Sequence, residues 1–294
     1  MKVTDLTFLF PADPLNPHEP DTDYAEEYHA AGLVTNVSLI DLDLLLVQGK
    51  LKVNRDLSLS TLIVYRGWML TPEKYILLQD LINDAGARLL TDGNAYKATH
   101  LLPSWAHHAN TLKSAWTFDL KDEALVNLLS QFSGPVTVKD FVKSRKYEWD
   151  AAFFIPEARD YQQALTVIHN FIQRQAENLV GGIVIREFVP LLRTGTHLRE
   201  NLPMFEEYRV FYWRSSPFVI IDYWNHNLKY LDESDQLFIR ENGRDINSPF
   251  FTIDFARKPD GSLIIMEIGD GQVSGLQDYD VNHFYSLLFN KIAN

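Results

Sequence analysis

Short apolar runs alternate with helical patterns in the first third of the chain. The run at residues 60–65 is rich in β-branched and aromatic side chains and predicts a strand. Residues 72–85 predict a helix, because their apolar positions share one face, at Tyr75, Leu78, Leu81 and Ile82. Gly86 suits the end of that helix, and the run at 87–90 predicts another strand. This order of elements is typical of an α/β fold.

The sequence between residues 100 and 115 is irregular and rich in Pro, Trp, His and Asn, so we place a domain boundary near residue 110. Beyond it, helices are predicted at 161–178 and 279–292. Pro259-Asp260-Gly261 predicts the turn of an antiparallel hairpin. The predicted strands of this second part cover residues 136–139, 151–155, 183–189, 207–213, 218–224, 251–256 and 263–268. Antiparallel strands with few helices between them predict an α+β sheet domain behind the α/β domain.

Composition narrows the classes of function. Hydrophobic residues make up 46% and charged residues 22% of the chain, which is typical of a folded globular protein. A net charge of −12 disfavours non-specific binding to nucleic acid. The chain contains no Cys, which excludes disulfides, thiolate nucleophiles and Cys-bound metal clusters. We expect a cytoplasmic protein, because the first residues lack a signal-peptide pattern and the apolar runs are too short to span a bilayer.

The common catalytic motifs are missing. Gly49-Lys50 lacks the other residues of a P-loop, and the glycines of 269–275 come too near the end of the chain for a dinucleotide-binding βαβ unit. The nine His residues include no HExxH pair, and no GxSxG sequence marks a nucleophilic serine. The chemistry must therefore come from other polar segments.

Three segments are unusually polar for the strands in which they lie. Four cations and a hydroxyl group gather in residues 139–146, a set that suits a polyphosphate. Two charges interrupt the β-branched strand at 183–189, and Pro190 ends its pairing. Asp254 and Glu267 lie on the two arms of the predicted hairpin, and with Asp270 they predict an oxygen-only Mg²⁺ site. Each segment also has a structural interpretation. The lysine-rich segment can be a solvated loop, the charged strand end can be an edge that prevents aggregation, and the two hairpin carboxylates can face solvent.

The order of these segments resembles that of the ATP-grasp enzymes, and in particular a poorly characterised bacterial and phage clade of that superfamily. The similar segments are Val138–Ser144, Val184–Phe188 and Glu267–Gln272, with a looser similarity at Tyr65–Trp68. The resemblance implies a split ATP-grasp fold behind an N-terminal α/β domain. It also implies ATP and Mg²⁺ as cofactors.

The resemblance assigns roles to the nucleotide-binding residues. Lys139 is similar to the strand lysine that contacts adenine and a phosphate, and Lys143 with Ser144 lies where a phosphate-covering loop is expected. The segment Arg186, Glu187, Phe188 and Val189 resembles the hinge whose backbone reads the adenine edge. Glu207 resembles the acid that binds the ribose hydroxyls.

The resemblance also assigns the residues near the reaction. Asp254 and Glu267 are similar to the carboxylates that bridge ATP phosphates through Mg²⁺. Gly269 stands where the family has an Asn ligand, so Asp270 is the substitute third ligand. Arg209 is expected to bind a carboxylate or acyl phosphate through two parallel hydrogen bonds, and Arg66 is the next candidate for this role. Lys143 is expected to contribute to catalysis from the loop that covers the phosphates. The loop after Lys139 lacks the family's glycines and relies on basic side chains.

We therefore expect an N-terminal α/β domain at 1–110, a lid subdomain at 111–190 and a metal-binding subdomain at 191–294. The resemblance implies an ATP-dependent ligase that joins a carboxylate to an amine through an acyl phosphate. One alternative is a non-catalytic nucleotide- or protein-binding module with a regulatory or immunity role. The other is a nucleic-acid end-modifying ligase or kinase, which the net charge disfavours. The carboxylate, the amine acceptor and the oligomeric state are left open by the sequence.

Overall fold

The computed structural model describes residues 6–57, 62–196, 203–224 and 231–293. The chain divides into two compact units. Unit 1 comprises residues 1–99, 208–254 and 269–294, and unit 2 comprises residues 100–207 and 255–268. No helix in the described part of the chain combines the length and apolar character needed to cross a bilayer. Each unit is described below by itself.

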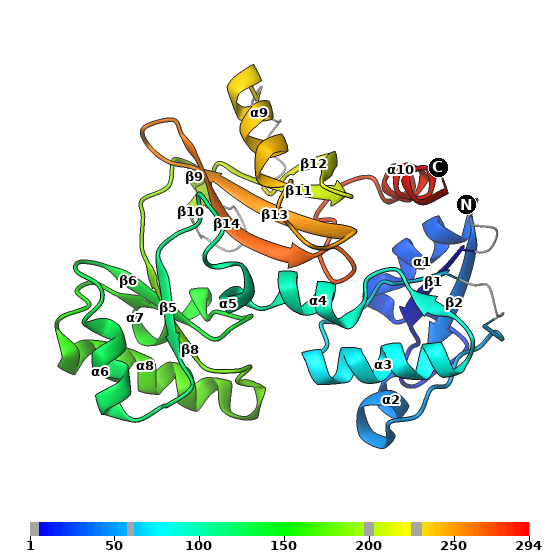
Figure 1. Ribbon diagram of the computed structural model, residues 1–294, viewed down its shortest axis with the longest axis horizontal. Coiled ribbons are helices and arrows are strands. Elements are labelled where there is room, and N and C mark those ends of the chain that lie inside the picture. The colour runs from blue at the N-terminus through cyan, green and yellow to red at the C-terminus, as the bar shows by residue number, and fades with distance from the viewer. Residues whose placement is uncertain (1–5, 58–61, 197–202, 225–230, 294) are drawn as a thin grey trace. The chain divides into compact units, whose positions relative to one another are not determined.

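The first sheet of unit 1 is parallel, with the strand order β2-β1-β3-β4. Helices α1 (Ala25–Gly32), α2 (Leu42–Gln48) and α3 (Pro72–Asp84) connect its strands in sequence order (Figure 1). The strands are β1 (Leu6–Pro11), β2 (Asn36–Ile40), β3 (Leu62–Tyr65) and β4 (Arg88–Leu89). Because a parallel sheet is covered on both faces, its strands are apolar throughout, and all six residues of β1 are buried.

The two faces of this sheet pack into different hydrophobic clusters. Phe8 and Phe10 of β1 join a cluster with helix α10 (Val281–Ala293), whereas Leu9 joins one with α3. This division follows from the alternation of side chains along a strand. The first cluster also contains Phe211 and Phe250, so the N-terminal sheet and the C-terminal helix share one core with strands from late in the chain.

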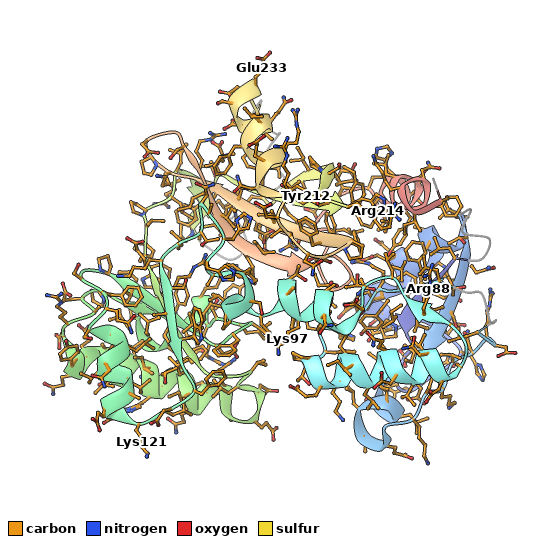
Figure 2. All side chains as sticks on the ribbon, viewed as in Figure 1. Arg88, Lys97, Lys121, Tyr212, Arg214 and Glu233 are labelled. Carbon is orange, nitrogen blue, oxygen red and sulfur yellow. The ribbon has the colours of Figure 1, made fainter. Side chains whose placement is uncertain are left out.

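The second sheet has the order β12-β11-β13-β14. Its strands are β11 (Glu207–Trp213), β12 (Ser216–Asp222), β13 (Phe250–Arg257) and β14 (Leu263–Asp270). Strands β11 and β12 are antiparallel, and the β13–β14 turn contains Gly261 at φ +88°, a left-handed value that favours glycine. Helix α9 (Glu233–Asn242) is tied to this sheet by Tyr212, whose hydroxyl donates to the Ile239 carbonyl at 2.7 Å. Figure 2 shows Tyr212 near the base of α9, whereas the exposed Glu233 lies at the opposite end.

Unit 2 is built on an antiparallel sheet with the order β5-β8-β6-β7. Helices α6 (Asp122–Leu129) and α8 (Tyr161–Gln175) contribute Leu125 and Phe171 to a cluster on one face of that sheet. Its strands are β5 (Ser114–Thr117), β6 (Val136–Lys139), β7 (Phe154–Ile155) and β8 (Ile183–Glu187). Unit 2 also contains α5 (Leu102–Trp105), α7 (Trp149–Ala152), β9 (Arg193–Thr196) and β10 (Pro203–Phe205), and α4 (Gly93–His100) lies almost entirely in unit 1.

The predicted fold class is confirmed, because a parallel α/β sheet precedes antiparallel sheets. The strands predicted at 136–139 and 207–213 have the observed ends, and Gly86 follows α3 with φ +82°. The strand predicted at 151–155 is wrong in its first half, where helix α7 takes residues 149–152. Such a short apolar run does not distinguish the period of a helix, 3.6 residues, from the two-residue period of a strand. Residues 60 and 61 of the first predicted strand lie outside the described residues.

A buried arginine ties the C-terminal segment of unit 1 to β3. The Arg66 side chain is 1% exposed, and its Nη1 donates to the carbonyls of Gly271 and Ser274 at 2.7 and 3.0 Å. Its Nη2 and Nε donate to the Glu27 carboxylate at 2.5 and 3.0 Å. Tyr285 of α10 donates to the same Glu27 oxygen at 2.6 Å. Arg66 therefore joins β3, α1, the segment after β14 and α10.

Asp270 is enclosed in the same region. Its Oδ1 accepts hydrogen bonds from the Gln272 backbone and side chain at 2.9 and 3.2 Å, and Oδ2 has no hydrogen-bond partner among the described residues. Gln272 also donates to the Tyr75 hydroxyl at 2.7 Å and accepts from the Tyr65 backbone at 3.2 Å. Burial raises the pKa of Asp270 to about 7, against the weaker opposing effects of Gln272 and Arg66. The carboxyl group therefore holds its proton to a higher pH than an exposed aspartate does.

Replacing Arg66 is expected to weaken the native state strongly. In Arg66→Met, Glu27 keeps a largely buried charge without its partner, and two carbonyls lose their donor. Removal of one partner from such a pair lowers the free energy of unfolding by roughly 3–5 kcal/mol. Urea denaturation followed by far-UV circular dichroism measures it. The control is Lys52→Met, whose pair with Asp41 is exposed and is worth about 1 kcal/mol or less. Equal losses in the two variants would contradict the role of Arg66.

Asp270 is expected to make unit 1 less stable as the pH rises. Between its unfolded pKa near 4 and its folded pKa of about 7, the native chain holds a proton that the unfolded chain has released. The free energy of unfolding therefore falls with rising pH, by roughly 2–3 kcal/mol between about pH 5 and about pH 8. Asp270→Asn lacks this titration, so the stability difference between variant and wild type should change by that amount over the same range. A constant difference, measured by denaturation at each pH, would show that Asp270 is ionised throughout.

Candidate functional site

Strands β6 and β8 send alternate side chains to opposite faces of the unit 2 sheet. The residues that face α6 and α8 are Val136, Val138, Ile183 and Ile185. Lys139 and Arg186 occupy positions of the opposite parity and therefore share the other face. Thr137 pairs with Arg186 and Lys139 pairs with Val184, so the two cations are diagonal neighbours. Both are buried, at 8% and 7% exposure.

Arg186 is held from two sides. Its Nη1 donates to the Met266 carbonyl at 2.6 Å and its Nη2 to the Ile265 carbonyl at 3.4 Å. The Trp105 ring lies 5.6 Å from the guanidinium carbon, within cation–π range. Its Nε has no hydrogen-bond partner among the described residues. Burial lowers the pKa of Arg186 to about 10, against the opposing charge of Glu267.

The Lys139 ammonium group forms a long ion pair with Glu267 and is also affected by the charge of Asp140. Its Nζ lies 3.9 Å from Glu267 Oε1, and the Glu267 side chain is 47% exposed. Burial lowers the pKa of Lys139, and Arg186 lowers it further, while Glu267 and Asp140 oppose the shift. Burial and the charges of Lys139 and Lys143 also lower the pKa of His100 to about 4, so this imidazole is neutral near pH 7. The region thus contains three cations, Lys139, Lys143 and Arg186, and two carboxylates, Glu267 and Asp140.

Asp140 is occupied by the turn that follows Lys139. Its Oδ1 accepts from the backbone of Val142 and Lys143 at 2.7 and 2.5 Å. Its Oδ2 accepts from the Gln175 side chain at 2.9 Å and the Val180 backbone at 3.3 Å. The turn returns the chain so that Ser144 forms a β-bridge with Lys139. Lys143 and Ser144 are exposed beside the buried lysine, and the structure brings these three predicted residues together.

The predicted hinge follows the end of β8 at Glu187. The Phe188 ring contacts Phe154 and Trp149, at centroid distances of 5.0 and 5.8 Å. Glu187 is exposed, and Phe188 and Val189 are partly buried. Glu207 begins β11 and is partly buried. Sequence reasoning did not identify the aromatic residues that pack against this predicted hinge.

In unit 1, Arg209 and Asp254 form a two-point ion pair. Nε donates to Oδ1 at 2.9 Å, and Nη2 donates to Oδ2 at 2.8 Å. Nη1 donates to the Gly275 carbonyl at 3.1 Å, and the guanidinium lies 5.2 Å from the Tyr223 ring centroid. Both side chains are largely buried, at 13% and 15% exposure. Two residues predicted for separate roles are thus in direct contact.

The three predicted metal carboxylates have different surroundings. Among the described residues, no group of three or more His, Asp or Glu side chains is placed to hold a metal ion. Glu267 fits an oxygen-ligand role, because its carboxylate is half exposed. Asp254 fits a ligand role if its carboxylate oxygens bind the metal ion while they also accept hydrogen bonds from Arg209. Asp270 suits the role poorly, because its carboxyl group is enclosed and burial raises its pKa to about 7.

Sequence reasoning missed His100 and Trp105 as neighbours of the two buried cations. Both lie in the irregular segment that was used to place a domain boundary. The unusual density of Trp and His there was the available signal. Their contact partners lie about 40 to 80 residues farther along the chain, and the sequence does not specify such distant contacts.

Comparison with known proteins gives both a family and a fold. Residues 128–288 match the model described as "ATP-grasp domain, R2K clade family 3". A search of curated protein sequences found no match. The matched segment is more than half of the chain and contains Lys139, Arg186, Arg209, Asp254 and Glu267.

Several solved structures share the fold over almost the whole chain. D-alanyl-alanine synthetase A from Vibrio cholerae O1 biovar eltor str. N16961 is 10% identical, with a TM-score of 0.59 and 98% of each chain covered. The RimK domain protein ATP-grasp from Sphaerobacter thermophilus DSM 20745 is 14% identical, with a TM-score of 0.58 and 98% of each chain covered. The ATP-grasp ligase PsnB, solved with a precursor variant, Mg and ADP, is 12% identical, with a TM-score of 0.57 and 99% of each chain covered.

At these identities the structural matches establish the fold, and the family model establishes the relationship. Both agree with the family resemblance drawn from the sequence. The chain belongs to the ATP-grasp domain family designated R2K clade family 3.

Proposed function

We propose that this protein is an ATP- and Mg²⁺-dependent ligase that joins a carboxylate to an amine through an acyl-phosphate intermediate. Family membership supports the use of ATP. The structural neighbours include ligases and synthetases, and PsnB was solved with Mg and ADP. The division of residues 111–294 into a lid and a metal-binding subdomain at residue 190 is part of this proposal.

The observation that carries the proposal is the buried pair of cations, Lys139 and Arg186, on one face of the unit 2 sheet. Burying a charge is costly unless an opposite charge accompanies it. Glu267 is half exposed, and the buried Asp140, which also acts on Lys139, uses both of its oxygens in hydrogen bonds within the turn after β6. A bound polyphosphate would supply the missing negative charge and accept hydrogen bonds from both side chains.

The other nucleotide contacts are assigned from the resemblance to the family. The backbone at Glu187–Val189 would read the adenine edge, next to the ring of Phe188. Glu207 would bind the ribose hydroxyls. Lys143 and Ser144 would cover the phosphates from the turn after β6, where both side chains are exposed.

We assign Glu267 and Asp254 to Mg²⁺ and give Asp270 a structural role in the segment after β14. Mg²⁺ in nucleotide sites is commonly held by one or two carboxylates together with substrate phosphates, so a complete cage of side chains is not required. The ion would neutralise charge on the phosphates.

In the first step of the reaction, a carboxylate oxygen of the acid substrate attacks the γ-phosphorus, and the bond from that phosphorus to the bridging oxygen breaks, which releases ADP. In the second step, the amine attacks the acyl carbon, phosphate leaves and the nitrogen loses a proton. The protein's part is to position the reactants and neutralise charge. Lys139 and Arg186 would bind and neutralise the nucleotide phosphates. Arg209, which Asp254 and Gly275 hold in orientation, would bind the acyl phosphate.

A second candidate is a module that binds nucleotide without ligating a substrate. The observation that favours it is the two-point pair of Arg209 with Asp254, which engages an expected clamp and an expected metal ligand with each other. The two candidates share the nucleotide site and differ in whether a product forms.

Lys139→Met is expected to weaken nucleotide binding while stabilising the protein without nucleotide. The substitution removes a buried cation that costs native stability, but it also removes one charge-assisted hydrogen bond to a phosphate. Loss of that bond corresponds to roughly tenfold to a hundredfold weaker binding. Isothermal titration calorimetry with ADP and thermal melting measure the two effects. Lys121→Met, at an exposed unit 2 lysine labelled in Figure 2, is the control and should change neither. Unchanged ADP affinity in Lys139→Met would remove this residue from the site.

Ligation is expected to yield a product whose mass equals the acid plus the amine less one water. Purified protein is incubated with ATP, Mg²⁺ and a pool of amino acids and peptides, and ADP and new adducts are measured by mass spectrometry. ADP binding without any adduct from substrate pools or cell extract would favour the binding module.

Arg209→Lys should lower turnover roughly a hundredfold with ADP affinity unchanged, because a point charge cannot replace the planar fork that meets Asp254.

A further inference from the structure

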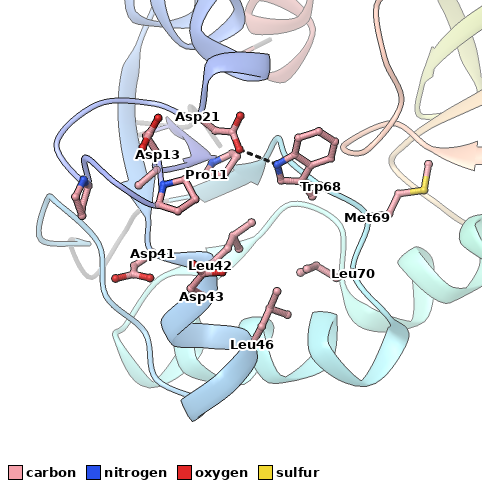
Figure 3. Close-up of a pocket in the computed structure, with 13 residues that line it drawn as sticks. Pro11, Asp13, Asp21, Asp41, Leu42, Asp43, Leu46, Trp68, Met69 and Leu70 are labelled. Atoms are coloured by element: carbon pink, nitrogen blue, oxygen red, sulfur yellow. Dashed lines mark hydrogen bonds between the residues drawn. The ribbon is translucent and has the colours of Figure 1, made fainter. Parts of the chain in front are cut away.

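A cavity of about 220 Å³ lies in unit 1, at the carboxyl-terminal edge of the parallel sheet. Its walls come from the segments that follow β1, β2 and β3, as Figure 3 shows. The strand order β2-β1-β3-β4 changes direction between β1 and β3. In open α/β sheets, the crevice at such a reversal, outside the carboxyl ends of the strands, is where ligands bind. The cavity thus occupies the position at which this fold offers a binding site.

One wall of the cavity is a partly exposed indole held in place. Trp68 is 45% exposed, and its Nε1 donates to Asp21 Oδ2 at 2.9 Å, the dashed line in Figure 3. The Tyr24 ring meets it edge-on at 5.2 Å. Leu42, Leu46 and Leu70 add apolar surface. A fixed aromatic ring beside aliphatic side chains suits the stem of an organic ligand, and the π-system attracts a cation.

The charged side chains that line the cavity are all acidic, and the lysines Lys52 and Lys74 lie outside the lining, in contact with Asp41 and Leu46. Four aspartates line it, whereas the described lining residues include no Lys, Arg or His. The described cation that pairs with one of them is Lys52, at 3.3 Å from Asp41, and its side chain is 60% exposed. The four acids are Asp13, Asp21, Asp41 and Asp43.

Two of these acids have structural tasks, and two have oxygens to spare. Asp21 holds Trp68, and Asp41 caps α2 by accepting from Leu44 N at 2.9 Å. Asp13 uses only Oδ1, which accepts from the backbone of the following loop, so its Oδ2 remains available. Asp43 makes no hydrogen bond or ion pair with other described residues. Negative charge in a concave site with apolar walls concentrates its field on whatever enters.

We propose that this pocket binds the ammonium group of an alkylamine, of the kind carried by a lysine side chain, with the alkyl stem against Trp68. The proposal concerns unit 1 alone and does not depend on ATP or on ligation. A metal ion fits less well, because no group of three acidic side chains in the described part of the chain is arranged to hold one. If the ligase proposal is also correct, the pocket supplies recognition of a basic substrate.

The test compares two probes that differ in charge but hardly in shape. Two probes are used, Nα-acetyl-lysine methylamide, whose side-chain ammonium group is free, and Nα-acetyl-norleucine methylamide. Their binding to the full chain is measured by calorimetry and ligand-observed NMR, without nucleotide. The lysine derivative should bind at least tenfold more tightly, and its affinity should fall as salt is added. Equal binding of the two probes, or no binding of either at millimolar concentration, would overturn the proposal.

Variants locate the binding in this cavity. Asp13→Asn combined with Asp43→Asn should weaken binding of the lysine derivative about tenfold or more. The loop should remain folded, because asparagine retains the Oδ1 acceptor. Trp68→Leu should weaken binding without any change of charge. The control Asp80→Asn, an exposed acid on α3 outside the lining, should bind as the wild type does. If the control weakens binding as much as the double variant does, the attraction comes from the overall net charge and the pocket assignment fails.

ADP binding separates this proposal from the one for the nucleotide site. The pocket variants should keep wild-type affinity for ADP, and Lys139→Met should keep wild-type affinity for the lysine derivative. Loss of both affinities in a single pocket variant would indicate a folding defect and contradict the assignment for that residue. A thermal melt of each variant identifies that outcome directly.

Discussion

The pleat of two strands in unit 2 places Lys139 and Arg186 on the same buried face. On the other face, the same strands supply Val136, Val138 and Ile185 to the core with α6 and α8. A shift of either strand by one residue would send the cation of that strand into the apolar core, so the core packing fixes the position of the charges. The nucleotide proposal depends on this constraint more than on any single hydrogen bond.

Lys139 and Arg186 differ from the largely buried arginines elsewhere in the chain in how their charges are paired. Arg66, Arg209 and Arg257 are also largely buried, and each is paired with its own carboxylate, on Glu27, Asp254 and Glu206 respectively. These pairs satisfy both charges within the chain. Lys139 and Arg186 have Glu267 nearby, but its carboxylate is half exposed and 3.9 Å from the lysine. A site in which buried cations have only a distant, half-exposed carboxylate and one already hydrogen-bonded elsewhere is suited to an anionic ligand, whereas the satisfied pairs stabilise the fold.

Much of the architecture could be predicted because it depends on local patterns. The β-branched runs of β6 and β8, the turn at Gly261 and the helix end at Gly86 each follow from a few neighbouring residues. The failure at residues 151–155 has the same basis, because a run of five apolar residues is compatible with a helix turn and with a strand. Packing against Phe188 and α8 decides between the two.

The sequence by itself determined which residue types were present and their order: a strand lysine, a charged strand end, an arginine strand and two carboxylate strands. That order was enough to predict the fold class and the family. Only the tertiary structure decided the ionisation and partners of those residues. It paired Arg209 with Asp254, enclosed Asp270 so that burial raises its pKa to about 7, and engaged Arg66 with Glu27 and two carbonyls. It also gathered Asp13, Asp43 and Trp68 around one cavity. These outcomes depend on burial and on contacts between distant segments, and the spacing of residues along a chain specifies neither.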